Sequence, residues 1–200
     1  MPSADFWYEF ASTYSYPAAM RIEALAVARG IVLNWRPFLL GPIFAARGMM
    51  DSPFNLNAAK GHYMWRDLER ICARHGLPLR RPEPFPQNGL LAARVALVVE
   101  DARRPEFSRK VYSAEFGDGR PIGERESIAA ILESVGLEAG DILQRAGTAP
   151  IKGKLRSETA RAESLGIFGA PNVVTADGEV FWGNDRLEEG LDWAVAGAPG

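Results

Sequence analysis

Asp5-Phe-Trp-Tyr-Glu-Phe-Ala-Ser-Thr-Tyr-Ser-Tyr-Pro17 is the stretch that decides the fold. Its first six residues are aromatic-rich and unbroken, which favours a buried strand. The hydroxyl side chains and Pro17 that follow are typical of the first turn of a helix, which ends at Gly30. Ile31-Val-Leu-Asn-Trp-Arg36 is then a second strand with β-branched and aromatic residues. Strand, helix and strand in this order predict a right-handed crossover and a parallel pair.

The C-terminal end has a complementary pattern. Ser157 to Leu165 is predicted to be a helix, and residues 167–182 a hairpin that turns at Ala176-Asp177-Gly178. A last helix should begin at Gly183-Asn-Asp-Arg186, with Asn184 or Asp185 as its cap.

Between these ends the chain is mainly helical. A proline-rich connector at 77–86 interrupts the helices. The predicted helices are Ala58–His75, Leu90–Asp101, Glu106–Phe116, Arg125–Val135 and Ala139–Arg145. The pattern predicts an α/β thioredoxin-like fold with a helical insertion between its two halves. Residues 1–57 and 148–200 would form the thioredoxin-like domain, and residues 58–147 the inserted helical domain.

Composition excludes several classes of function. The 200 residues are 47% hydrophobic and carry a net charge of −2, so no basic surface for nucleic acid or anionic membrane is indicated. One cysteine, Cys72, and two histidines cannot build the usual zinc site, and no metal is expected. No apolar run approaches the length of a membrane span. Asp5 and Glu9 stand where a secretory signal would be basic and then apolar, which predicts a cytoplasmic protein.

Three places could carry chemistry. Ser12-Thr-Tyr-Ser15 lies where disulfide oxidoreductases have Cys-x-x-Cys at a helix N-terminus, so serine stands at both cysteine positions. The proline of Gly169-Ala-Pro171 precedes a strand, where thioredoxin folds have a cis peptide that leaves backbone groups open to a ligand. Trp182-Gly-Asn-Asp-Arg186 could hold an amino acid's charged ends at a helix N-terminus. Each has a plainer interpretation: a helix cap, a strand-entry proline, and a cap with an exposed charge pair.

Together these segments resemble a known family. The matching blocks are Phe6-x-x-x-Phe10-x-Ser12-x-x-Ser15-Tyr16, Lys60-Gly-x-Tyr63-x-x-x-Asp67-Leu68, Phe85-Pro-x-Asn88-x-x-x-Ala-x-Arg94, Phe168-Gly-Ala-Pro171 and Trp182-Gly-Asn-Asp-Arg186. The pattern is similar to the 2-hydroxychromene-2-carboxylate isomerase family of the DsbA-like thioredoxin superfamily, which is close to kappa-class glutathione transferases. The match runs from about Asp5 to about Trp193. It departs from the family at Thr13, often proline there, and at Asp51, where kappa-class relatives tend to have asparagine.

The resemblance implies a role for each matching residue. Ser12 would donate a hydrogen bond to the sulfur of glutathione, and Ala170 and Pro171 would bind its cysteinyl backbone. Lys60 would lie near the glycyl carboxylate or the substrate. The γ-glutamyl end would contact Trp182, Gly183, Asn184 and Asp185. Asn88 and Arg94 would lie beside the aromatic substrate.

The implied activity is a glutathione-dependent cis–trans isomerisation between 2-hydroxychromene-2-carboxylate and trans-o-hydroxybenzylidenepyruvate by thiolate addition, bond rotation and elimination. The partners would be glutathione and a small aromatic substrate, in a homodimer. A kappa-type glutathione transferase or peroxidase is the nearest alternative, and a silent thioredoxin-like peptide-binding module is an alternative of another class. The apolar loop Phe38–Ala46 would line the aromatic pocket or belong to the core.

Overall fold

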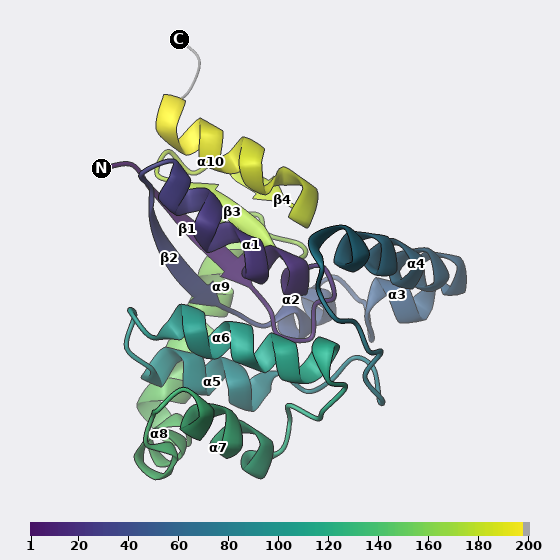
Figure 1. Cartoon of the computed structure of the whole chain (residues 1–200), viewed down its shortest axis with the longest axis vertical. Helices are drawn as coiled ribbons and strands as arrows, with labels where there is room; N and C mark the ends of the chain where they lie inside the picture. Colours follow the sequence, from purple (N-terminus) through teal and green to yellow (C-terminus); the bar gives the residue numbers. More distant parts are fainter. Residues whose placement is uncertain (198–200) are drawn as a thin grey trace.

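A mixed four-stranded sheet lies in the upper half of the molecule as drawn in Figure 1, with a group of helices below it. The computed structural model describes residues 1–197. The strand order is β2-β1-β3-β4, with β1 parallel to β2 and antiparallel to β3. The strands are β1 (Ser3–Tyr8), β2 (Val32–Pro37), β3 (Asn172–Thr175) and β4 (Val180–Trp182). The predicted thioredoxin-like sheet, with its parallel pair and its hairpin, is therefore confirmed.

Alternation along β1 directs side chains to two separate cores, since successive strand residues point to opposite faces. Phe6 and Tyr8 join the larger core, which includes residues of α1 (Ser15–Ala28) and α10 (Leu187–Ala196). Trp7 joins a smaller core on the other face, with residues of α9 (Ala149–Ser164) and α2 (Leu40–Ala46). Figure 1 shows α1 and α10 in front of the sheet and α9 behind it.

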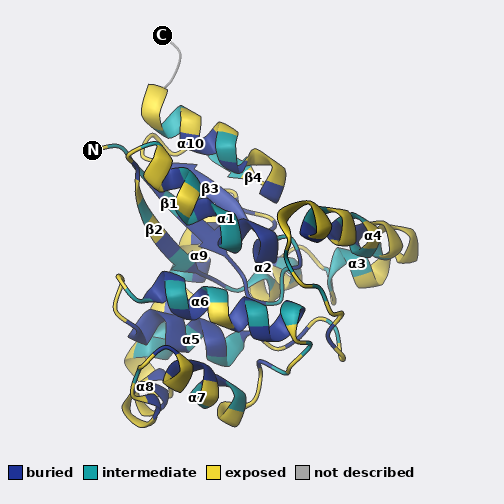
Figure 2. Ribbon diagram, viewed as in Figure 1, coloured by how far each residue is buried: buried dark blue, intermediate teal, exposed yellow. Residues whose placement is uncertain are grey.

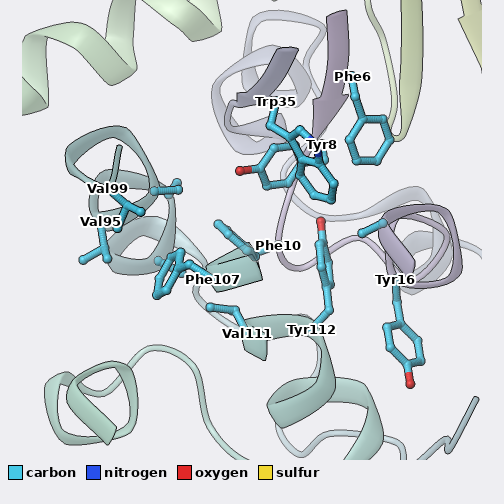
Figure 3. Close-up of a cluster of buried hydrophobic side chains, with 14 of the residues drawn as sticks. Phe6, Tyr8, Phe10, Tyr16, Trp35, Val95, Val99, Phe107, Val111 and Tyr112 are labelled. Atoms are coloured by element: carbon cyan, nitrogen blue, oxygen red, sulfur yellow. The ribbon is translucent and has the colours of Figure 1, made fainter. Parts of the chain in front are cut away.

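The inserted helices attach to the end of this sheet through aromatic packing. Tyr8 and Phe10 contact the ring of Tyr112, and Phe10 also meets Phe107 (Figure 3). Both partners come from α6, so the insertion shares one core with the sheet. These helices are α5 (Leu90–Val98), α6 (Arg104–Tyr112), the π-helical turn η1 (Ser113–Gly117), α7 (Arg125–Ser134) and α8 (Ala139–Ala146).

The helix α4 (Ala58–His75) has the bounds that the sequence predicted. The Asn57 side chain accepts a hydrogen bond from the Lys60 N–H at 3.0 Å, and Gly76 ends the helix with φ 63°. Only Met64, Leu68 and Cys72 of α4 are buried, and the helix projects beside the sheet with most of its surface exposed (Figure 2).

Two predictions about local structure between the strands were wrong. The supposed apolar loop at 38–46 contains helix α2, with Pro42 in its first turn, where a missing N–H costs nothing. A short helix α3 (Pro53–Leu56) follows it. The helix predicted from Ser157 begins at Ala149, again with a proline in its first turn.

The last helix also begins differently. Neither Asn184 nor Asp185 caps it, because residues 184–186 form the 3-10 turn η2 and α10 starts after Arg186 without a side-chain cap. Within residues 1–197, no helix is both long enough and apolar enough to cross a membrane.

Candidate active site

A cleft of about 800 Å³ opens where the turn after β1 meets α2, α3 and the start of α5. Its wall is mainly apolar and includes Leu39, Leu40, Pro42 and Phe44 of the segment that was predicted to line an aromatic pocket. Phe38 and Ile43 of the same segment are buried in the smaller core. Both interpretations of this segment are therefore partly right, because one face of α2 packs inward and another faces the cleft.

Ser12 lies in this cleft at the N-terminus of α1. Its Oγ donates a hydrogen bond to the Ala170 carbonyl oxygen at 3.1 Å and accepts one from the Ser15 N–H at 3.3 Å. The second bond holds the oxygen in place, while the hydroxyl proton can turn to another acceptor. Ser12 therefore accepts a hydrogen bond from the first residue of α1 and also presents a donor to the cleft, while Tyr14 holds the N-cap position without a side-chain cap.

The Ala170–Pro171 peptide bond is cis, as the sequence predicted. Ala170 lines the cleft opposite Ser12, whereas Pro171 is buried behind it and its carbonyl oxygen accepts the Gly183 N–H at 2.9 Å. The hydrogen bond between Ser12 and Ala170 brings together segments 158 residues apart in the chain.

Trp182 forms the wall that the two halves of the site share. Its ring meets Phe168 edge-on, with 4.7 Å between centroids, and half of the side chain is exposed. The indole also covers Gly169, where a Cβ atom would lie only 2.7 Å from Nε1. Glycine at 169 is thus required for the indole to come this close to the backbone.

A second cleft of about 710 Å³ meets the first at Tyr14, Phe54, Ala170 and Trp182. It contains the predicted residues Gly183, Asn184 and Asp185. The Asn184 oxygen accepts a hydrogen bond from Arg21 at 3.1 Å, which fixes the buried amide, whereas Asp185 is exposed. Unlike the first cleft, this one has many charged groups on its wall: Arg21, Asp67, Arg70, Arg74, Asp185 and Glu188, together with His75.

The predicted site residues mostly converge on the two clefts, with two exceptions, Pro171, which is buried, and Arg94. Lys60 and Asn88 line the first cleft with Ser12 and Ala170, and both are exposed there. Arg94 lies on α5 and lines neither cleft. Its Nε atom is buried with no hydrogen-bond partner in the described part of the chain.

Several lining residues were not predicted from the sequence. Glu9 and Arg47 add an acid and a base to the first cleft, and Tyr14 donates a hydrogen bond to Asp67 at 3.1 Å where the clefts meet. Burial and the Asp67 carboxylate raise the pKa of the Tyr14 hydroxyl. Glu9 lies inside the aromatic stretch 6–10, which the sequence predicts to be a buried strand. An acid at a buried position could have identified Glu9 as a candidate site residue from the sequence alone.

The lone thiol takes no part in this site. Cys72 is buried in the core under α4, and burial raises its pKa to about 11. A single buried cysteine cannot carry out disulfide exchange of the Cys-x-x-Cys kind. No group of three or more metal-ligating side chains occurs among the residues that the structure describes.

Known proteins share both the sequence pattern and the fold. A family model described as a DSBA-like thioredoxin domain matches residues 4–192. The chain is 29% identical over 184 residues to 2-hydroxychromene-2-carboxylate isomerase of Sphingobium xenophagum, covering 92% of this chain and 93% of that protein. It is 28% identical over 200 residues to glutathione S-transferase kappa 1 of Homo sapiens, covering 93% and 88%.

A solved structure of 2-hydroxychromene-2-carboxylate isomerase superposes on the chain with a TM-score of 0.83 at 25% identity. The superposition covers 92% of this chain and 90% of that one, so the similarity includes the inserted helices as well as the sheet.

Proposed function

The chain belongs to the DSBA-like thioredoxin domain family, and from that premise we propose that it is a glutathione-dependent isomerase. Its substrate would be 2-hydroxychromene-2-carboxylate, interconverted with trans-o-hydroxybenzylidenepyruvate, or a related aromatic-degradation intermediate. The observation that carries the proposal is the hydroxyl of Ser12, placed at a helix N-terminus in an apolar cleft, 3.1 Å from the carbonyl oxygen before Pro171.

The residues around Ser12 fit a bound thiol. The hydroxyl proton of Ser12 can turn from Ala170 to a sulfur, since the oxygen is held independently by the Ser15 N–H. The N-terminus of α1 adds positive potential at the same point. A donor and a helix dipole both favour the thiolate, so the thiol pKa would fall toward neutrality without a protein base.

The second cleft fits the γ-glutamyl end, which carries both an ammonium and a carboxylate. Asp185 offers an acceptor for the ammonium, and the arginines of this cleft offer donors for the carboxylate. The two clefts meet at Ala170 and Trp182, so one extended tripeptide could contact both. Lys60 would then pair with the glycyl carboxylate or with the carboxylate of the substrate.

The first cleft fits an aromatic substrate. Apolar and aromatic side chains from α2, α3 and the proline-rich connector form most of its wall, as is typical of sites for small organic molecules. Glutathione held at Ser12 would supply the thiolate nucleophile for addition to a conjugated carbon, and elimination after rotation about the resulting single bond would release it. Ser12 stabilises the thiolate at the beginning and the end of this cycle.

Two measurements test the proposal. Absorbance should show isomerisation of o-hydroxybenzylidenepyruvate with glutathione and little without it. Calorimetry should show binding of reduced glutathione. No heat of binding at millimolar glutathione would overturn the isomerase and the transferase together.

Two alternatives have their own discriminating tests. A kappa-type glutathione transferase or peroxidase is supported by the 28% identity to glutathione S-transferase kappa 1. It predicts conjugation or peroxide reduction across a panel of electrophiles with no isomerase activity. A silent peptide-binding module predicts no glutathione binding and no turnover. We also propose a homodimer, as the family resemblance implies, which light scattering after size-exclusion chromatography would test.

A further inference from the structure

Glu9 places a carboxyl group at the inner wall of the first cleft. The residue is only 8% exposed, yet it lines the cleft with Ala11 and Ser12. Its backbone is fixed by two donors, because its carbonyl oxygen accepts the Ser12 N–H at 3.1 Å and the Tyr112 hydroxyl at 2.8 Å. Gly89 leaves room for the carboxyl group, since a Cβ there would lie 3.3 Å from Oε1.

The surroundings keep this carboxyl group neutral. Two groups interact electrostatically with it, Tyr112 of α6 and Glu115 of η1, and neither is a cation. The cations of the same cleft are Arg47 and Lys60, and within residues 1–197 neither of them, nor any other base, forms an ion pair with Glu9. Burial raises the pKa of Glu9 to about 8, although the Ala11 N–H partly opposes the rise. At neutral pH Glu9 therefore holds a proton that it could lose to a group in the cleft.

Glu115 provides a built-in comparison. It is fully buried, and neither carboxyl oxygen has a hydrogen-bond partner in the described structure. Burial, together with the charge of Glu9, raises its pKa well above the usual range. It does not line either cleft, so its proton cannot reach a substrate there. Both glutamates are buried, but only Glu9 can be reached from the first cleft.

We propose that Glu9 is a catalytic acid–base residue that lends its proton to the keto oxygen of the substrate and takes it back. The inference rests on the proposed isomerase function. As the S–C bond forms, the conjugated π electrons move to the keto oxygen, which takes the Glu9 proton. After rotation the carbonyl re-forms, the C–S bond breaks and the proton returns to Glu9. No net oxidation or proton transfer results, and thiolate and carboxylic acid are both regenerated.

The test compares Glu9→Gln with Glu115→Gln, which removes the buried carboxyl group that has no access to the cleft. Glu9→Gln should lower kcat at pH 7 by about 10²-fold, the low end for general acid catalysis because the amide can still donate a hydrogen bond. Glutathione affinity should stay within about twofold in both variants, and Glu115→Gln should keep most of the turnover. The wild-type kcat should fall above the Glu9 pKa, and this fall should vanish in Glu9→Gln.

The protonation of Glu9 can also be measured without substrate, so that this test does not depend on turnover. In the free protein labelled with ¹³C at the glutamate carboxyl carbons, one resonance should titrate near pH 8. It should be absent from Glu9→Gln and present in Glu115→Gln. The inference is overturned if Glu9→Gln turns over at the wild-type rate, if it loses glutathione binding along with turnover, or if no glutamate titrates near pH 8. If Glu9→Gln does not fold, the wild-type titration and pH profile still decide. A wild-type protein that binds glutathione but does not isomerise would instead contradict the proposed function.

Discussion

The two clefts are similar in size and differ in chemistry. The first, about 800 Å³, is walled mainly by apolar side chains, with Glu9, Arg47, Asp51 and Lys60 as its charged groups. The second, about 710 Å³, has seven titratable charged or imidazole side chains on its wall besides two tyrosines. Under the proposed function, the apolar cleft would bind the aromatic reactant and the charged cleft the peptide-like ligand.

The proposed reaction takes place at the boundary between the two clefts. Ala170 and Trp182 line both, and Ser12 lies on the apolar side of that boundary. If the clefts bind the two reactants in this way, variants on one side should change turnover and variants on the other should change glutathione affinity.

The largest effect is expected for Ser12→Ala. The variant should keep the fold and most glutathione affinity, but it should raise the pKa of the bound thiol because a charge-assisted donor is lost. Turnover should fall by about 10²-fold near neutral pH and recover partly at higher pH as thiolate returns. Ultraviolet titration of bound glutathione reports the thiolate directly.

Ser15→Ala is the matched control for this variant. Ser15 occupies the other cysteine-like position, but its hydroxyl is buried and lines neither cleft. Its substitution should leave the thiol pKa and turnover nearly unchanged. A covalent adduct on Ser12 trapped by mass spectrometry, or an unchanged thiol pKa in Ser12→Ala, would contradict the role of Ser12 as a donor.

Much of this boundary could be predicted from the sequence. The Ser12 turn and the Phe168–Pro171 block are local patterns, because a helix start and a strand-entry proline depend mainly on neighbouring residues. Their meeting across 158 residues followed from the thioredoxin-like order of elements, and the hydrogen bond to Ala170 bears it out. Gly183, Asn184 and Asp185 also converge on one cleft.

The rest depended on packing that no local pattern contains. Arg94 was assigned to the substrate by its place in a motif, yet it lines neither cleft. Glu9 and Arg47 enter the cleft because α2 and the inserted helices pack around the end of β1. The first turn of α2 was hidden by Gly41 and Pro42, which in sequence indicate a loop.

A smaller effect is expected for Gly183→Ala, on the charged side. Gly183 has φ 119°, and a Cβ there would lie 2.5 Å from Asp185 Oδ1. The strain should cost about 1–3 kcal/mol and displace the Asp185 carboxylate. We expect about a tenfold weaker Kd for glutathione and a lower Tm, with the KM for the aromatic substrate little changed.

Gly153→Ala is the control, because it replaces a glycine by alanine at a position where no backbone strain is expected. Gly153 lies within α9, and a Cβ added to it would meet no other atom within 4 Å. Alanine there should therefore be neutral or stabilising by about 0.5–1 kcal/mol. Equal Tm values for the two alanine variants would show that the backbone at 183 tolerates a side chain and does not shape the charged cleft.

Asp185→Ala should weaken glutathione binding by about fivefold or less. The Asp185 side chain is 79% exposed in the free protein, and exposed ion pairs contribute only about 0.2–1 kcal/mol. Asp192→Ala is the control, because Asp192 also pairs with an arginine on the surface, Arg29, but lies outside both clefts. Calorimetry showing equal glutathione affinity for the two variants would remove Asp185 from the binding site.

The smallest effect is expected for Lys60→Met, which also decides which ligand this lysine serves. Lys60 is exposed in the wall of the first cleft, so pairing with a carboxylate should change affinity by about threefold at low salt and less at high salt. A weaker Kd for glutathione alone would assign Lys60 to the glycyl carboxylate, and a higher KM for the aromatic acid alone would assign it to the substrate. Lys154→Met, an exposed lysine outside both clefts, should change neither constant. If Lys60→Met behaves like Lys154→Met at low salt, the apolar cleft binds its reactants without this cation. The two clefts would then differ more in their use of charge than the charged side chains on their walls suggest.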